Sequence, residues 1–158
     1  MDQNLDIKNE VAVMEQAEKQ LVTKDYAGMF ADETNATVGK DWTTFDLTTE
    51  EQRKELLSRI TGNVQKLMDN VGSVLTVEGV YIENVEMQDK ATGEVKIFPR
   101  ILLCAKEGTY STMGITVFNS MRKLMKYLGM PTKEKPLKVK VSLTNNNGKQ
   151  FYSLTPVK

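Results

Sequence analysis

Residues 74–82 read VLTVEGVYI, a stretch rich in β-branched side chains that follows a period of two. This pattern predicts a strand, and Gly79 within it predicts a bulge or a bend. Turn-forming residues follow at 88–93, and residues 94–105 predict a second long strand. Pro99 has no amide proton to give to a ladder, so we expect an edge or a bulge at that point.

After this ribbon of two predicted strands (residues 74–82 and 94–105), the sequence predicts a short strand, a helix and a hairpin. Residues 109–112 predict the strand, and a helix then runs to Gly129, with Pro131 just after it as a stop signal. The residues expected on the inner face of this helix are Met113, Val117, Met121, Leu124 and Leu128. Residues 137–143, LKVKVSL, alternate without error, and the loop NNNG at 145–148 leads into a return strand over 150–154.

Upstream of the ribbon, residues 42–47 predict a strand and residues 48–51, TTEE, a capping box with Thr48 as the N-cap. The apolar spacing after it predicts a helix over about residues 49–68. Residues 9–23 predict an earlier helix with one apolar stripe, and residues 31–40 a loop. We therefore divide the chain into a partly helical N-terminal extension, 1–40, and one domain, 41–158.

From residue 42 onward the expected order is β-α-β-β-β-α-β-β. Meandering strands with a helix before the final hairpin are typical of the oligonucleotide-binding (OB) barrel. The fold class that we predict is α+β, mainly β: an OB-like five-stranded barrel with a helix between the third and fourth strands, plus the N-terminal helical extension.

The net charge of zero hides a strong asymmetry along the chain. Residues 1–50 carry four basic and eleven acidic side chains, and residues 101–158 carry ten basic and two acidic ones. Such asymmetry indicates a polyanionic partner for the basic part, unless the folded chain interleaves the two parts and cancels the field. We predict that the acidic extension competes with DNA for the basic face, or that it docks replication or recombination proteins.

Enzymatic chemistry is disfavoured by the residues that are missing. The chain has no histidine and a single cysteine, Cys104, which removes the usual activated nucleophiles and a structural zinc site. Cys104 lies in an apolar strand and is expected to be a core residue. Paired acids such as Glu50 and Glu51 are explained by helix capping, so we expect no catalytic activity, no metal and no cofactor. No transmembrane stretch or secretory signal is visible, and we expect a cytoplasmic protein.

Basic residues interleaved with aromatics give the positive evidence. A single strand of nucleic acid needs cations for its phosphates and flat rings for its bases. The nucleic-acid-binding candidates are Lys96, Phe98, Arg100, Lys106, Tyr110, Arg122, Lys138, Lys140, Lys149 and Tyr152.

Strand alternation sorts some of these candidates onto faces. Lys138 and Lys140 share the outer face of their strand, as a binding ribbon or as an edge protected against aggregation. Lys96, Phe98 and Arg100 form a row on one strand. Phe151 and Tyr152 point to opposite faces, so at most one of them lies in the core. For any one aromatic, core packing is the simpler interpretation.

Taken in order, several segments resemble phage-encoded single-stranded DNA-binding proteins. They are residues 42–47, 86–96, 99–103, 108–112, 129–131 and 136–140. The resemblance spans about residues 42–155 and implies an OB barrel that coats single strands in the host cytoplasm during phage replication. It also implies DNA contacts at Lys96, Arg100, Tyr110, Lys138 and Lys140. Many single-strand coating proteins carry an acidic C-terminal tail, whereas here the acidic segment is N-terminal.

The sequence therefore predicts non-catalytic, largely sequence-independent binding and protection of single-stranded DNA in replication or recombination. The alternative is a phage-encoded interaction module that binds or inhibits a host protein. RNA binding is a second alternative, and homo-oligomerisation stays open.

Overall fold

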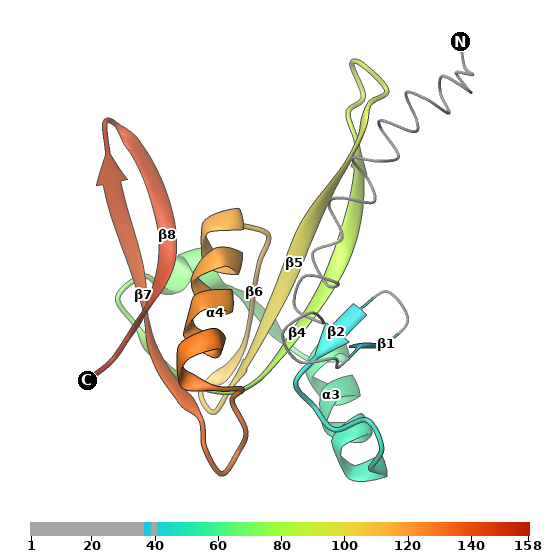
Figure 1. Ribbon diagram of the computed structural model, residues 1–158. Coiled ribbons are helices and arrows are strands. Elements are labelled where there is room, and N and C mark those ends of the chain that lie inside the picture. The colour runs from blue at the N-terminus through green and yellow to red at the C-terminus, as the bar shows by residue number, and fades with distance from the viewer. Residues whose placement is uncertain (1–36, 39–40) are drawn as a thin grey trace.

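The computed structural model describes residues 37–38 and 41–158 (Figure 1). The helix predicted over residues 9–23, and nearly all of the acidic extension, lie outside the described residues. The described elements are, in order, β1 (Thr37–Val38), β2 (Asp41–Thr43), α3 (Glu50–Thr61), β3 (Val64–Lys66), the 3-10 helix η2 (Leu67–Asn70), β4 (Val74–Gln88), β5 (Val95–Ala105), β6 (Gly108–Thr112), α4 (Ile115–Leu128), β7 (Leu137–Asn146) and β8 (Lys149–Pro156). The predicted mixture of mainly strands with helices is confirmed.

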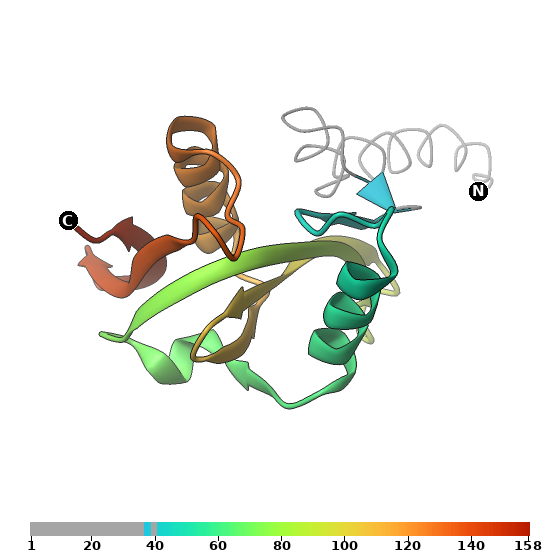
Figure 2. The same ribbon diagram turned by 90° about the horizontal axis from the view of Figure 1, so that it is seen from below.

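Strand β4 organises the described part of the sheet. One of its edges pairs with β5 over most of its length. The other pairs first with β7 through residues 74–77 and then with β2 through Tyr81 and Ile82. β6 continues the sheet beyond β5, β3 joins β6 in parallel, and β8 pairs with β7. In Figure 2 the light-green β4 arches across the molecule, which gives the sheet the shape of a half barrel. Among the described strands, β6 and β8 do not pair, so the curl does not close.

A bulge in β4 allows residues before and after a shift in strand register to face the same core. The pairing with β5 shifts between Val77 and Gly79, as the glycine predicted. Leu75 and Val77 face the larger core before the shift, and Val80 and Ile82 face it afterwards. At Gly79 a Cβ would lie 2.6 Å from the ring of Phe45, so the close approach of that ring requires glycine.

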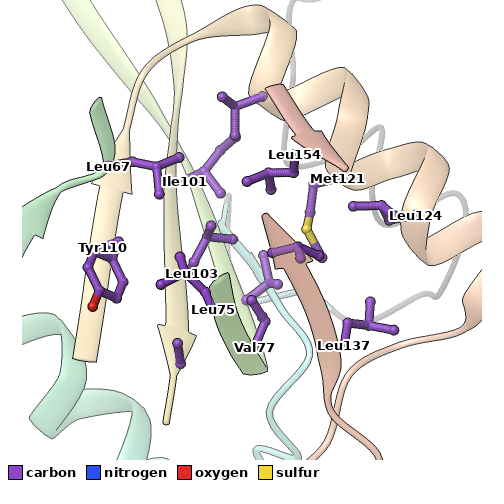
Figure 3. Close-up of a cluster of buried hydrophobic side chains, with 14 of the residues drawn as sticks. Leu67, Leu75, Val77, Ile101, Leu103, Tyr110, Met121, Leu124, Leu137 and Leu154 are labelled. Carbon is purple, nitrogen blue, oxygen red and sulfur yellow. The ribbon is translucent and has the colours of Figure 1, made fainter. Parts of the chain in front are cut away.

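The sheet buries side chains on both faces. The larger cluster joins β4, β5, β7 and β8 to α4, and Figure 3 shows Met121 and Leu124 of α4 directed toward Leu154 and its neighbours. A smaller cluster on the opposite face joins Tyr81 and Leu102 to Leu56 of α3. The two helices thus lie on either side of the β4–β5 ribbon, and α4 lies between this ribbon and the β7–β8 hairpin (Figure 1).

The helix predicted over residues 49–68 is shorter and begins one residue later than expected. Its N-cap is Thr49, whose hydroxyl accepts from the Gln52 amide, whereas Thr48 bonds to Asp46. It ends at Thr61. Gly62 breaks it, and residues 64–66 pair with β6 instead of continuing the helix. Pairing with a distant strand overrides the helical spacing that Val64 and Leu67 suggest.

Two further boundaries differ from prediction. The strand expected over residues 42–47 ends at Thr43, because the chain turns there and Phe45 and Leu47 pack against the smaller cluster. On α4, Val117, Met121 and Leu124 are buried as predicted, but Leu128 is exposed and Phe118 and Met125 take the remaining inward positions. Gly129 ends α4 with a φ of 91° and donates its amide proton to Met125, as predicted.

The edge and turn predictions are confirmed. Pro99 lies where β5 has β4 on one side and no described strand on the other. Asn147 and Gly148 both have positive φ, 53° and 81°, as a two-residue turn between β7 and β8 requires. Among the described helices, none is both long and apolar enough to cross a membrane.

Candidate nucleic-acid interface

The ten predicted binding residues fall in separate parts of the described structure. Lys138, Lys140 and Lys149 lie on the β7–β8 hairpin, and Lys106 lies in the turn between β5 and β6. Lys96, Phe98 and Arg100 lie on the part of β5 that pairs only with β4. Arg122 is half-buried on α4, and Tyr110 and Tyr152 contribute to the core. The structure therefore does not gather the ten residues into one site.

The outer face of the β7–β8 hairpin is the longest polar surface among these places. Strand pairing puts Lys140 opposite Thr155, Ser142 opposite Ser153, Thr144 opposite Phe151 and Asn146 opposite Lys149. Since side chains alternate along a strand, all of these point away from the core face that holds Val139, Val141 and Leu154. From Lys138 to Asn146 this hairpin face is about 27 Å long.

Lys138 and Lys140 are exposed at one end of the hairpin face, and neither forms an ion pair with the described residues. Lys138 is paired with Thr76 of β4, and the carbonyl of Thr76 accepts a 2.8 Å hydrogen bond from the Lys106 amide. The β5–β6 turn therefore brings a third lysine to the same stretch of β4.

One carboxylate lies beside these lysines. Glu107 accepts hydrogen bonds of 2.8 and 2.9 Å from the amide and hydroxyl of Thr76. Partial desolvation opposes its ionisation, but the bonds from Thr76 and the nearby Lys106 charge outweigh that effect and lower the pKa of Glu107. Glu107 is therefore ionised at neutral pH and offsets part of the local positive charge.

The predicted row on β5 exists, but one of its charges is already paired. The β4–β5 register places Lys96 opposite Met87, Phe98 opposite Val85 and Arg100 opposite Glu83. Arg100 donates a 2.7 Å hydrogen bond to the Glu83 carboxylate. Of the two cations in this row, Lys96 is exposed and forms no ion pair with the described residues.

Two aromatic candidates are corrected by their burial. Tyr110 is only 5% exposed and packs in the larger core, so no base can stack on it in this conformation. Tyr152 is paired with Leu143 and packs against the same core. Phe151, on the opposite face of β8, is 38% exposed and is the available ring of that pair.

Tyr127 is not among the ten candidates, yet it is 76% exposed at the end of α4 with the Lys126 ammonium 5.7 Å from its ring centre. The helical spacing of the buried residues places Tyr127 off the inner face, which is the signal that finds it.

A groove of about 300 Å³ lies where the tip of the hairpin meets α4. The helix contributes Thr116, Asn119, Ser120 and Lys123. The hairpin face contributes Thr144, Asn146, Phe151 and Ser153. The groove thus continues the surface that begins at Lys138 and Lys140.

A second cavity, of about 290 Å³, lies beside α3 and has the opposite electrostatic character. Its carboxylates come from Asp46, Glu51, Glu55, Glu78 and Glu134. Arg59 crosses it, with ion pairs to Glu55 at 3.1 Å and Glu78 at 4.0 Å, and donates to the Ala105 and Gly108 carbonyls. Lys133 adds a second basic side chain, but the acids outnumber the bases, and this lining disfavours phosphate.

Metal and thiol chemistry find no support in the described residues. Among them, no group of three or more acidic, cysteine or histidine side chains is placed to hold a metal ion. Cys104 is buried, and desolvation raises the pKa of its thiol to about 12 despite the nearby Arg59 charge.

Comparison of the chain with protein-family models, curated proteins and solved structures gave no match.

Proposed function

We propose that this protein binds and protects single-stranded DNA without catalysis, through the outer face of the β7–β8 hairpin. One observation carries the proposal: Lys138, Lys140 and Phe151 lie on one face of one hairpin, exposed and without ion pairs to the described residues. Lysines neutralise phosphates and an exposed ring stacks bases, which are the two elements of a single-strand site.

The charge balance of the described domain supports the same function. Residues 41–158 hold seventeen Lys and Arg against thirteen Asp and Glu, a formal charge of +4. Several of the acids line the cavity beside α3, and no lining residue of that cavity belongs to β7 or β8. The hairpin side is thereby left as the positive surface, which favours association with a polyanion.

The topology supports an OB-type barrel as the finer description of the fold. β4, β5 and β6 form a meander, α4 follows the third of these strands, and β7 returns to pair with β4 before β8. In OB barrels, which are partly open, the loop between the last two strands contributes to oligonucleotide binding. The β7–β8 hairpin occupies the corresponding place in this topology.

The experiment that tests the function is fluorescence anisotropy of a labelled 30-mer deoxythymidine strand titrated with the full chain. We expect binding that weakens steeply between about 50 and 200 mM salt, because phosphate neutralisation releases counterions. We expect much weaker binding to a duplex of the same length, because paired bases cannot stack on Phe151. A strand of uridines measured in parallel separates DNA from RNA preference. Absence of binding at low salt would refute the proposal.

A further inference from the structure

The groove between α4 and the tip of the hairpin has walls that are held together. The Thr116 hydroxyl donates to the carbonyl of Tyr152, which ties the first turn of α4 to β8 beside Phe151. The Ser120 hydroxyl in turn donates to the Thr116 carbonyl at 2.7 Å. The backbone beside Phe151 is therefore held against α4 before any ligand arrives, which lowers the entropic cost of binding.

The lining has the chemistry of a site for a flat, polar ligand with a negative group. Phe151 supplies one ring, Asn119 and Asn146 supply two amides, and Lys123 supplies one ammonium. The side chains of both asparagines make no hydrogen bond to the described residues. No carboxylate lines the groove.

Other ligand classes fit this lining poorly. A cation would meet the Lys123 ammonium without a compensating carboxylate, and an apolar ligand would cover the unpaired amides. A nucleobase offers a face for the phenyl ring and a donor–acceptor edge that an amide pairs with.

We infer that this groove seats one nucleobase of the bound single strand. The base stacks on Phe151, the amides of Asn119 and Asn146 bond to its edge, and Lys123 faces its phosphate. The inference rests on the proposed function and extends it, because a seat that bonds to a base edge adds a base preference at one nucleotide. The groove continues the face of Lys138 and Lys140, so one strand reaches both.

Photo-crosslinking locates the seated base. A 15-mer of deoxythymidines carrying a single 5-iodouracil, moved along the strand in successive probes, is irradiated with the full chain, and the linked peptide is identified by mass spectrometry. We expect linkage at Phe151, lost in Phe151→Ala and kept in the matched control Tyr127→Ala, whose ring is exposed but outside the groove. Links that map only outside α4 and the hairpin would overturn the inference.

Base preference gives the second readout. Affinities for 15-mers of deoxyadenosine, deoxycytidine and deoxythymidine are measured for the parent chain and for Asn119→Ala and Asn146→Ala. We expect the affinity ratios between bases to change by about 5-fold or more in these variants, because a bidentate amide–base contact discriminates at that level. Asn145→Ala is the control, since Asn145 is exposed at the same turn but points to the opposite face. Ratios that stay unchanged in both groove variants would overturn the inference.

The two proposals fail in different ways. If the deoxythymidine 30-mer binds and Lys138→Ala/Lys140→Ala weakens it, while the groove variants change neither crosslinks nor ratios, the function stands and the base seat is wrong. If no strand binds at low salt, both proposals fall together.

Discussion

Arg100 of β5 donates a 2.7 Å hydrogen bond to the carboxylate of Glu83, which faces it across the β4–β5 ribbon. The pair is partly exposed, and its charges neutralise each other. A guanidinium held in this way has little charge left for a phosphate. Arg100 is thus engaged in a structural ion pair, whereas Lys138 and Lys140 form no ion pair with the described residues. The sequence alone does not distinguish these basic residues.

Replacing Arg100 with Gln is accordingly expected to leave single-strand affinity within about 2-fold of the parent chain. A small loss of stability, on the order of 0–1 kcal/mol, is expected from the partly exposed ion pair. Anisotropy and urea denaturation measure the two effects separately. A loss of affinity as large as that of a hairpin lysine variant would show that Arg100 leaves Glu83 to bind DNA.

Removing both hairpin lysines is expected to weaken binding and flatten its salt dependence. For single strands, the slope of log K against log salt changes by about 0.7 per phosphate contact, so Lys138→Ala/Lys140→Ala should reduce its magnitude by about 1.4. The charge-matched control is Lys66→Ala/Lys90→Ala, which removes two exposed lysines, from β3 and from the β4–β5 turn, that form no ion pair with the described residues. Equal effects of the two double variants would mean that only net charge matters and would contradict a localised face.

The close contact between Gly79 and the Phe45 ring should make the stability of the fold sensitive to any side chain at position 79. A Cβ at Gly79 would lie 2.6 Å from the Phe45 ring, so Gly79→Ala should destabilise the fold by about 1–3 kcal/mol through overpacking. Urea denaturation measures the loss. In the Phe45→Ala background the same substitution should cost less, because the obstructing ring is gone. An equal cost in both backgrounds would attribute the effect to the backbone of the bulge rather than to the ring.

Acid should remove the contribution of Glu107 to stability. Its pKa is lowered from the ordinary 4.5 in the folded chain, so the carboxylate stabilises the fold fully above that value and progressively less as pH falls through the native pKa. Glu107→Gln should thus be less stable than the parent at pH 7, with the difference shrinking by pH 3. Glu94→Gln is the control, because the Glu94 carboxylate accepts no hydrogen bond from the described residues. A difference for Glu107→Gln that is independent of pH would argue against this account.

Cys104 should be inert in the folded protein. Desolvation raises the pKa of its thiol to about 12, and the side chain is fully buried. We expect no reaction with a thiol-specific disulfide reagent at pH 8 under native conditions, and one equivalent of reaction in guanidinium chloride, since the chain has a single cysteine. Rapid native labelling would mean that the strand around Cys104 opens locally.

Local chemistry predicted much of the fold. The period of two in residues 137–143 places Lys138 and Lys140 outward, and the Asn147–Gly148 pair specifies the turn, because both signals depend on near neighbours. What the sequence could not predict depends on distant contacts. The helical spacing of apolar residues extended the predicted helix beyond Val64, because no local feature of the sequence shows that residues 64–66 pair with β6.

The same distinction explains the errors at the candidate site. Alternation shows that Phe151 and Tyr152 face opposite ways, but only the packing of α4 and β7 decides which of them is covered. Tyr110 is an aromatic residue in a short strand, two residues after Gly108, and its burial depends on the core that Leu67, Leu103 and α4 complete around it. Likewise, the pairing of Arg100 with Glu83 follows from the register of two strands joined by a turn.

The most direct test of the central claim is a residue-by-residue map of binding by NMR. The ¹⁵N-labelled full chain is titrated with a short deoxythymidine strand, and amide chemical-shift changes are followed. We predict that the largest changes gather along the outward residues of β7 and β8, from Lys138 to Phe151, with Lys106 and the Asn119 region of α4 beside them. Changes centred on the cavity around Arg59, or no changes at all at low salt, would contradict the account.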